Sequence, residues 1–159
     1  MATTSQIPAV LTGLYNAAFS ALSATTTVVD GPPLQWDPIV VPAGMASESR
    51  FLFVGARPED EIAVLQALQT RNTQGTARTE DIIAACTALA KADESSLASA
   101  RTAAFGIVAA LEQALRVDQT LNGACATATL SVDRYEQIQQ EDGAYAVVPC
   151  TITARAFLR

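Results

Sequence analysis

The stretch DQTLNGACATATLSV, Asp118 to Val132, divides the chain at a change of periodicity. A helical pattern ends at Leu121-Asn122-Gly123, where asparagine and glycine tolerate the left-handed backbone conformation that ends a helix. A two-residue alternation follows at once, with small apolar side chains on one face and mainly hydroxyl side chains on the other. The stretch is therefore predicted to be a helix-to-strand junction, and it holds no constellation of reactive side chains.

The segment before the junction, Ser95 to Leu115, has the most regular helical pattern in the chain. Its apolar stripe has to pack on a sheet or on another helix, and Glu112 and Arg116 have the spacing of an i,i+4 ion pair. The opposite face carries only small side chains, which are Ser99, Thr102, Ala103, Gly106 and Ala110. Either a second backbone approaches this face closely, or the helix exposes an alanine-rich surface.

Beyond the junction, the two-residue alternation of Ala124 to Val132 resumes from Ala144 to Ala156. The polar stretch EQIQQEDG lies between these segments, so we predict a hairpin of two long strands joined by a loop at Gln137 to Gly143. Pro149 lacks the amide hydrogen that a strand ladder requires, and it therefore indicates an edge position or a bulge.

The sequence before residue 60 predicts one helix and two strands. Pro8 to Leu22 has an amphipathic helical pattern, with proline suited to the first turn. The β-branched run that begins at Thr25 predicts a strand, which the turn Asp30-Gly31-Pro32-Pro33 ends. The aromatic and β-branched run Arg50 to Ala56 predicts a second strand.

Residues 32–50 form a long proline-rich segment without sustained periodicity, which is typical of a loop. This loop holds the single tryptophan, Trp36. The Trp36 side chain either anchors a neighbouring subunit or covers the core of its own domain.

Two segments, 61–71 and 80–91, fit both a helix and a strand. In the second segment, apolar residues recur at helical spacing, as Ile82, Cys86 and Leu89 do, and also at the alternating spacing of a strand. The alanine content favours helices by propensity. Periodicity alone leaves both interpretations open.

Length and charge limit the possible functions. The 159 residues correspond to one domain, 1–159, and a hydrophobic content of 50% is sufficient for a core. With 16 acidic and 10 basic residues and a net charge of −6, tight wrapping of nucleic acid is not expected. No targeting segment is recognised at the N-terminus, and the longest apolar run, Ala103 to Leu111, is too short to span a bilayer. We therefore expect a cytoplasmic protein without a membrane partner.

The sequence lacks the residues of the common catalytic and metal sites. It contains no histidine, no phosphate-binding glycine loop, no zinc-protease signature and no nucleophile elbow. Cys86, Cys125 and Cys150 lack CxxC spacing and are interpreted as buried apolar residues. Four acidic clusters are interpreted as helix caps and solvated turns: 59–61, 80–81, 93–94 and 141–142. We therefore expect no catalytic residue, cofactor or metal.

The order of the predicted elements resembles that of the tail terminator (tail completion) proteins of long-tailed bacteriophages. The resemblance spans most of the chain, from the strand that runs into VVDGPP to the closing hairpin that ends in TITARAF. It rests most on LRVDQTLNGA, Leu115 to Ala124, where the family often has an arginine, an aspartate and then Thr-Leu-Gly-Gly ahead of a strand. Asn122 replaces the first of these glycines, which left-handed geometry tolerates. The Gly143-Ala144 start of the last strand, with its Ala-Arg close, is a second similarity.

The resemblance implies an α+β fold with a central, mostly antiparallel β-sheet packed by two helices. The implied order is α-β-β-β-β-α-β-β, with a long C-terminal β-hairpin. Segments 61–71 and 80–91 would then be strands, although propensity favours helices.

The resemblance also implies a structural role in the virion tail or neck, after synthesis in the host cytoplasm. Such a chain would form a homohexameric ring that caps the tail-tube protein, stops its polymerisation and joins the head-side connector. DNA would pass through the lumen without sequence-specific binding. The alternatives are a head-closure or adaptor protein, a tail-tube subunit or, from a different class, a small cytoplasmic ligand-binding domain or an enzyme that uses carboxylates.

Interface residues are expected in the loop from Pro32 to Ser49, in the loop from Gln137 to Gly143, and at arginines near strand ends. These arginines either form salt bridges between subunits or keep strand edges soluble. The candidate interface residues are Trp36, Arg71, Arg78, Gln137, Gln139, Gln140, Glu141, Asp142 and Arg155.

Overall fold

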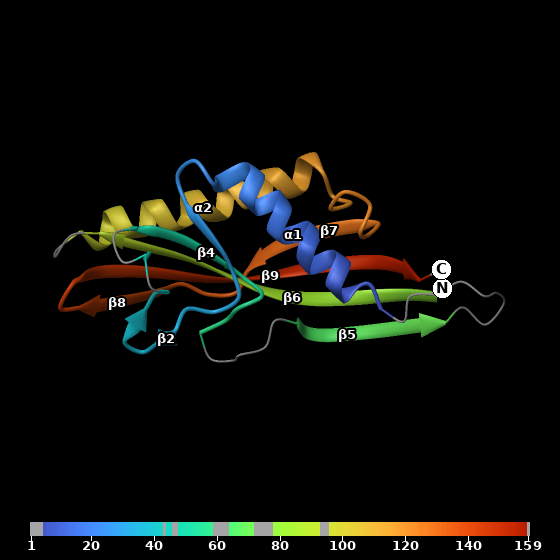
Figure 1. Cartoon of the computed structure of the whole chain (residues 1–159), viewed down its shortest axis with the longest axis horizontal. Helices are drawn as coiled ribbons and strands as arrows, with labels where there is room; N and C mark the ends of the chain where they lie inside the picture. Colours follow the sequence, from blue (N-terminus) through green and yellow to red (C-terminus); the bar gives the residue numbers. More distant parts are fainter. Residues whose placement is uncertain are drawn as a thin grey trace.

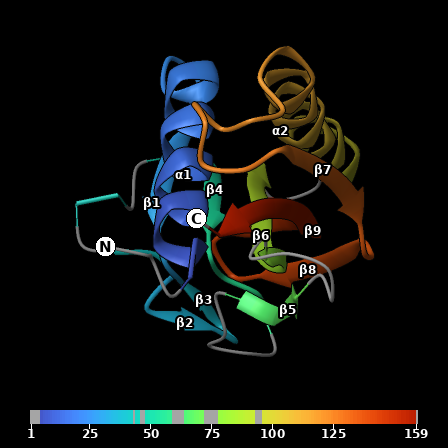
Figure 2. The same cartoon turned by 90° about the vertical axis from the view of Figure 1, so that its right-hand side faces the viewer.

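The computed structural model describes residues 5–42, 44–45, 48–58, 64–71, 78–92 and 96–158, without the side chains of residues 65 and 71. In this part of the chain, two helices lie side by side on one face of a seven-stranded sheet (Figure 1). The end view in Figure 2 shows the helices on one side of the sheet and a small hairpin on the other. No helix in the described ranges is long and apolar enough to cross a membrane.

The elements confirm an α+β fold with a mostly antiparallel sheet packed by two helices. The helices are α1, Ile7–Leu22, and α2, Leu97–Val117. The seven strands of the sheet are β1, Thr27–Asp30; β4, Arg50–Val54; β5, Val64–Arg71; β6, Arg78–Ala92; β7, Thr127–Val132; β8, Glu136–Gln140; and β9, Gly143–Leu158. The predicted loop 32–50 also contains a small hairpin made of β2, Gln35–Trp36, and β3, Ile39–Val40.

Two long antiparallel strands, β6 and β9, form the centre of the sheet and pair from Arg78↔Leu158 to Ala92↔Ala144. Along the other edge of β6 lie β5 and then β4, and β1 adds to β4 as the one parallel pair among the described strands. Along the other edge of β9 lie β7 and then β8. We call β1, β4, β8 and the adjoining parts of β6 and β9 the five-strand half, and β5, β7 and the remaining parts of β6 and β9 the four-strand half.

The two ambiguous segments form the strands β5 and β6, so the helix that propensity favours is wrong at both, and the strands that the resemblance implies are confirmed. Residues 61–63 lie outside the described ranges. In β6, the even-numbered side chains Ile82, Ala84, Cys86, Ala88 and Ala90 face the helices and are fully buried. Small side chains let the helices approach the sheet closely, and burial in a central strand outweighs the helical propensity of alanine.

The C-terminal hairpin has a shorter turn than the sequence predicts. Residues 136–140 form β8 and pair with the start of β9, so the expected loop from Gln137 to Gly143 is wrong and the turn is limited to Glu141-Asp142. β7 and β8 are separated by residues 133–135. The first of the two predicted long strands is therefore replaced by two short strands, β7 and β8, which both lie along the long strand β9.

Pro149 lies in the central strand β9, not at an edge, and it faces the interruption between β7 and β8. Its carbonyl oxygen accepts a hydrogen bond from the Asp133 backbone N at 3.0 Å. In an antiparallel ladder the N–H and C=O of one residue point to the same neighbour. The missing amide hydrogen of Pro149 therefore falls where the neighbouring strand is irregular.

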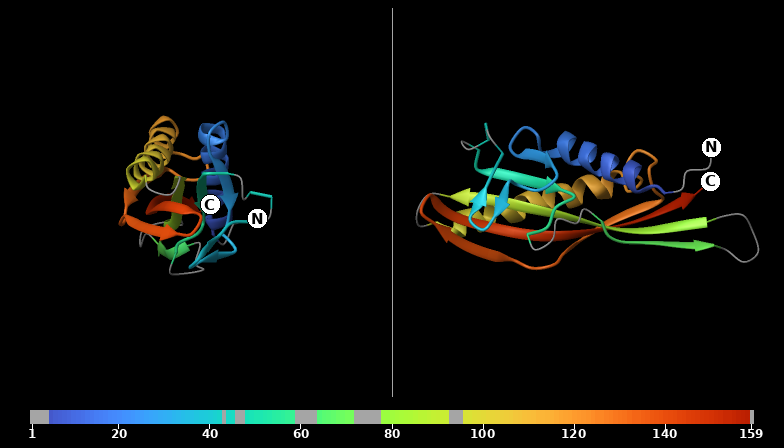
Figure 3. Two further views of the ribbon diagram at one scale, coloured as in Figure 1. Left: turned by 90° about the vertical axis from the view of Figure 1, so that its left-hand side faces the viewer. Right: turned by 60° about the horizontal axis from the view of Figure 1, so that its bottom comes forward.

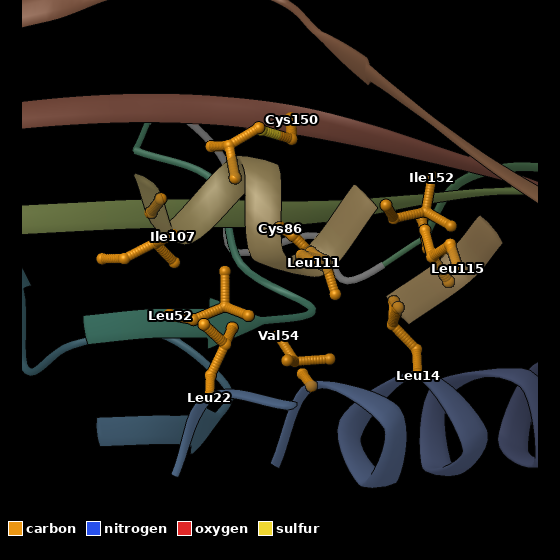
Figure 4. Packing of buried hydrophobic residues seen from close by; sticks show 14 of the residues in the cluster. Leu14, Leu22, Leu52, Val54, Cys86, Ile107, Leu111, Leu115, Cys150 and Ile152 are labelled. Atoms are coloured by element: carbon orange, nitrogen blue, oxygen red, sulfur yellow. The ribbon is translucent and has the colours of Figure 1, made fainter. Parts of the chain in front are cut away.

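The core has two parts on opposite faces of the sheet. The main part lies between the helices and the sheet, with Leu14 of α1, Leu111 of α2 and Ile152 of β9 among its buried residues (Figure 4). The second part lies on the other face of the five-strand half, where β2 and β3 cover Phe51 and Phe53. The five-strand half is therefore covered on both faces, and the four-strand half on one.

The helix-to-strand junction is held by Asp118, which occupies the C-cap position of α2 and whose carboxylate accepts hydrogen bonds from the turn that follows. Its Oδ1 accepts from the Thr120 backbone N at 3.0 Å and the Thr120 hydroxyl at 2.6 Å, and its Oδ2 accepts from the Asn122 backbone N at 2.7 Å. Leu121, Asn122 and Gly123 all have a positive φ, of 50°, 57° and 85°. The predicted left-handed backbone conformation is confirmed at these residues. The helix itself ends earlier than the sequence pattern predicts, at Val117.

Candidate interaction surfaces

No group of His, Cys, Asp and Glu side chains that could hold a metal ion occurs among the described residues. All three cysteines are buried, as predicted, and Cys86 and Cys150 are direct neighbours on β6 and β9. Burial raises the pKa of each of these two thiols to about 12. Both are therefore neutral near neutral pH, and a neutral thiol is a poor nucleophile and metal ligand.

The face of the four-strand half opposite the helices is uncovered among the described residues, and we call it the open sheet face (Figure 3). It is formed by even-numbered residues of β5 and odd-numbered residues of β6, β7 and β9. Hydroxyl side chains dominate it, and these are Thr70, Thr79, Thr127, Thr129, Ser131, Thr151 and Thr153. Leu68 and Phe157 on the same face are exposed by 54% and 57%. This surface can make polar and apolar contacts but has no proton-transfer machinery.

One ion pair interrupts the hydroxyl side chains of the open sheet face. Arg155 Nε and Nη2 donate to the two carboxylate oxygens of Asp81 at 2.7 and 3.1 Å. The hydrogen bond and charge of Arg155 lower the pKa of Asp81, so this carboxylate stays ionised. The pair adds no net charge. Asp133 adds one carboxylate at this face, where it accepts from the Thr151 hydroxyl at 2.8 Å, so the described face carries little net charge although the chain carries −6.

Both strands that border the four-strand half have an outer edge that pairs with no described strand. The direction of each backbone N–H and C=O follows from two hydrogen bonds, Asp133 N to the Pro149 carbonyl and Gly55 N to the Ala85 carbonyl, because this direction alternates from residue to residue along a strand. Ala85 of β6 points its groups to the side of β4 and β5, so Ala67, whose partner Ile82 points the other way, has its N–H and C=O directed away from the sheet. In β7, the same holds for Ala128, Leu130 and Val132.

The outer edges carry few charged residues: β7, Thr127–Val132, has none, and β5 has one, Arg71, at its end. Natural sheet edges usually carry lysine, proline or a bulge that prevents pairing with another chain. β5 has a bulge between Val64 and Gln66, at one end only, and β7 has no such feature. The two edges can therefore accept further strands.

The candidate interface residues lie at opposite ends of the sheet and do not form one site. Gln137, Gln139 and Gln140 belong to β8, next to the turn Glu141-Asp142, at the end of β9 that pairs with Ala92. Arg78 and Arg155 lie near the other end, where Arg78 pairs with Leu158. Arg71 pairs with Arg78 through the backbone, and its side chain lies outside the described part.

Two of the candidate residues contact their own chain closely. Trp36 is half-buried and packs edge-to-face on Phe53, with ring centroids 5.4 Å apart, so it covers the second part of the core. Asp142 accepts from the Tyr145 hydroxyl at 2.7 Å and from Lys91 Nζ at 3.0 Å. The hydrogen bond from Tyr145 lowers the pKa of Asp142, and Lys91 adds to this effect. These contacts fix the β8–β9 turn against the end of β6.

The small-residue face of α2 lines a groove beside α1 and is not covered by another described element. The groove has volumes of about 1190 Å³ toward the C-terminal end of α2 and about 580 Å³ toward its N-terminal end. Alanine, glycine, serine and threonine side chains of both helices line most of it, and Asp118 and Arg50 are the charged residues in the lining. Within the described part of this single chain, the small-residue face is therefore exposed or half-buried.

The acidic cluster 80–81 lies inside strand β6 and not in the solvated turn that the sequence suggests, and Glu80 is buried. Its carboxylate is 1% exposed and accepts from the Ser5 hydroxyl at 2.8 Å, the Gln6 backbone N at 2.6 Å and the Gln69 amide at 3.2 Å. The carboxylate thus caps the N-terminus of α1 from strand β6. The partners Ser5 and Gln6 are 75 and 74 residues away in sequence, so no local pattern could reveal the cap.

Gly13 of α1 was also missed, and it sets the distance between α1 and the junction. A β-carbon at this position would lie 2.8 Å from the Leu121 carbonyl oxygen and 2.9 Å from the Leu121 β-carbon. Only glycine leaves room for this approach. The left-handed run after α2 thus rests directly on α1.

No protein-family model matches the chain, and no curated protein matches it. The open sheet face, its two open edges and the interhelical groove are therefore interpreted from their geometry and chemistry.

Proposed function

We propose that the chain is the tail terminator subunit of a long-tailed phage. It assembles into a ring, caps the tail tube, stops the polymerisation of the tube and provides the surface that joins the head-side connector. The observation that carries this proposal is the open sheet face, a broad and nearly neutral surface between two strand edges that can each pair with another chain. Such a surface suits assembly better than catalysis.

The chemistry of the open sheet face fits a channel for DNA. Nucleic-acid affinity comes mainly from cationic side chains that neutralise phosphates. On this face the described cation, Arg155, is already paired with Asp81, and most other side chains are hydroxyls. A ring that turns this face inward would let DNA pass without holding it.

The junction adds support, because the resemblance to tail terminators rests most on Leu115 to Ala124. In the structure, this segment ends α2, rests on Gly13 of α1 and leads into β7. A rigid link between the helix layer and the border strand suits a subunit whose edge has to meet a neighbour at a fixed angle.

The test is electron microscopy of the purified chain, alone and mixed with tail tubes that lack a terminator. We expect closed rings that sit on tube ends and tubes that stop growing when the chain is added. Persistent monomers that ignore tubes would contradict the proposal. Open-ended filaments of the chain alone would instead indicate a tail-tube subunit, and rings that bind connectors but not tubes would indicate a head-closure or adaptor protein.

A second candidate function, binding of a small molecule, is favoured by the groove between α1 and α2. Its volume of about 1190 Å³ is somewhat larger than the roughly 300–1,000 Å³ that is typical of ligand pockets. However, the lining offers few polar groups that converge on one point, and its side chains are mostly small. A monomeric chain whose melting temperature rises with one specific small molecule would support this alternative.

A further inference from the structure

We propose that copies of this chain associate head to tail through their sheets, with β5 of one copy pairing with β7 of the next. The occupant of each open edge is thus a second copy of the same chain. This inference rests on the proposed function only in requiring self-assembly. It names the strands that make the contact and their relative direction.

The strand directions permit this pairing. β5 and β9 both run antiparallel to β6, and β7 runs antiparallel to β9. β5 and β7 therefore run in opposite directions at the two borders of the four-strand half. When the border strands of two equally oriented copies meet, they form an antiparallel pair like the others in this half.

The side-chain faces agree as well. At the outer edge of β5, Ala67 points its backbone groups outward and its side chain to the helix face. At the outer edge of β7, Leu130 does the same. Residues that pair across a ladder share a face. The combined sheet would therefore keep all helices on one side and all open sheet faces on the other.

In the four-strand half, the width of the sheet matches the width of the two-helix layer above it. Four strands at a spacing of about 4.8 Å occupy about 19 Å, and two helices at 8–10 Å each occupy about 18 Å. When β7 meets β5 of the next copy, α2 of the first copy comes next to α1 of the second. The helix layer would then continue without a gap over the combined sheet.

The outer flanks of the two helices carry exposed aromatic side chains. On α1, Tyr15 and Phe19 stack at 6.0 Å on the flank that faces away from the interhelical groove, and Phe19 is 50% exposed. On α2, the corresponding flank carries Phe105, which contacts Tyr135 at 5.6 Å and is 38% exposed. Head-to-tail contact would bury these flanks against each other and add apolar area to the backbone pairing.

Head-to-tail pairing is preferred over a two-fold dimer because it uses both edges. A two-fold contact of β7 with β7, or of β5 with β5, leaves the other edge of every copy unpaired. Repeated contact of β5 with β7 is heterologous. If the rotation between successive copies closes, it forms a ring in which no edge of the four-strand half is left unpaired.

Cysteine cross-linking tests the pairing directly. One preparation carries Leu68→Cys in β5, and a second carries Thr129→Cys in β7, or Ser131→Cys for the register shifted by two residues. All three sites lie on the open sheet face and are exposed. Cys125→Ser is present throughout, and Cys86 and Cys150 are at most 2% exposed. A Gln119→Cys preparation serves as an exposed control away from both edges.

A short bifunctional maleimide should link the β5 variant to a β7 variant in the mixture and leave each variant alone uncrosslinked. Cross-linking of a β7 variant with itself would show a two-fold contact and overturn the proposal. Assemblies in which neither mixture cross-links above the Gln119→Cys control would overturn it as well.

Proline substitution at the edge gives an independent test. Ala67→Pro removes an N–H that points away from the sheet, which an edge strand tolerates in the folded monomer. We expect self-association at least about tenfold weaker than in the Ala67→Thr control, which keeps the N–H. Val132→Pro, with Val132→Ala as its control, repeats the test on β7 if Ala67→Pro fails to fold by circular dichroism. Unchanged assembly of a folded proline variant would contradict the proposal.

The two proposals can fail separately. Rings that cap tubes but do not cross-link between β5 and β7 would retain the proposed function and reject this pairing. Cross-linked rings that ignore tubes would retain the pairing and reject the terminator function. A chain that stays monomeric would reject both.

Discussion

The two halves of the sheet share the long strands β6 and β9 but are built for different tasks. In the five-strand half, the helices cover one face and β2 and β3 cover the other, so β9 is buried at every position from Gly143 to Cys150. In the four-strand half, burial alternates along β9 from Thr151 onward, because the described elements cover only the helix face. The same strand thus supplies stability at one end and an accessible surface at the other.

The sharpest test of this comparison is truncation of an aromatic residue in the five-strand half. Phe53 is 0% exposed and contacts Phe51 and Trp36. Phe53→Ala should lower the free energy of unfolding by about 3–5 kcal/mol, because it leaves a cavity between the sheet and the hairpin of β2 and β3. Thr153→Ala on the open sheet face should change it by less than about 0.5 kcal/mol. Urea unfolding of both variants measures the difference, and equal losses would contradict the division into two halves.

A pair of glycine substitutions tests whether the junction is fixed against α1. Gly13→Ala should destabilise the fold by about 1–3 kcal/mol, because the new β-carbon meets the Leu121 backbone. Gly106→Ala is the matched control, since a β-carbon there meets nothing within 4 Å and alanine favours the helix. We expect this control to stabilise the protein by about 0.5–1 kcal/mol. Thermal unfolding that shifts in the same direction for both variants would refute the close contact.

Adjacent carboxylates of β6 test the two faces of the four-strand half. Glu80→Gln should cost about 1–3 kcal/mol, because the amide cannot accept from Ser5, the Gln6 backbone N–H and Gln69 at once, and a buried donor is left unpaired. Asp81→Asn on the open sheet face should cost less, because exposed ion pairs stabilise weakly. Denaturant unfolding compares them, and a larger loss for Asp81→Asn would reverse the assignment of faces.

The smallest expected effect is the pH dependence of the ion pair between Asp81 and Arg155. Arg155 lowers the pKa of Asp81 below its ordinary value of 3.8 in the folded state. A carboxyl whose pKa is lower when folded stabilises the fold above its unfolded pKa, and this contribution disappears as the pH falls through the folded pKa. The difference in melting temperature between the wild type and Asp81→Asn should therefore be small at neutral pH and shrink further as the pH falls from 3.8 through the lower pKa of the folded state. A difference that grows on acidification would contradict the ion pair.

Local sequence patterns predicted the elements that are buried on one face and exposed on the other. α1 and α2 were recognised because a stripe of apolar residues at helical spacing faces the sheet, and the Glu112–Arg116 pair forms at 2.7 Å as predicted. β6 could not be recognised in this way, since a strand buried on both faces shows no clear alternation. β8 was mistaken for a loop because its glutamines are polar, although their backbone completes the ladder of β9.

The surfaces were harder to predict than the elements. Arg155 was selected as an interface residue, but its partner Asp81 lies 74 residues away and was visible only in the folded chain. The sequence analysis placed residues 137–142 together with Arg78 and Arg155 among the candidate interface residues. In the structure, the two groups lie at opposite ends of β9. Sequence separation hides such relations because contacts across strands depend on register, which no local window contains.

The sequence by itself determined the helices, the junction at Asp118 to Val132 and the absence of histidine chemistry, because these depend on residue type and short-range spacing. Only the tertiary structure decided that the alanine-rich segments are strands, that Glu80 caps α1 and that Gly13 supports the junction, because each depends on residues brought together from distant parts of the chain. Within the described ranges, the tertiary structure also leaves one face of the four-strand half uncovered. That face, with its two open edges, is where the proposed assembly of this protein has to be tested.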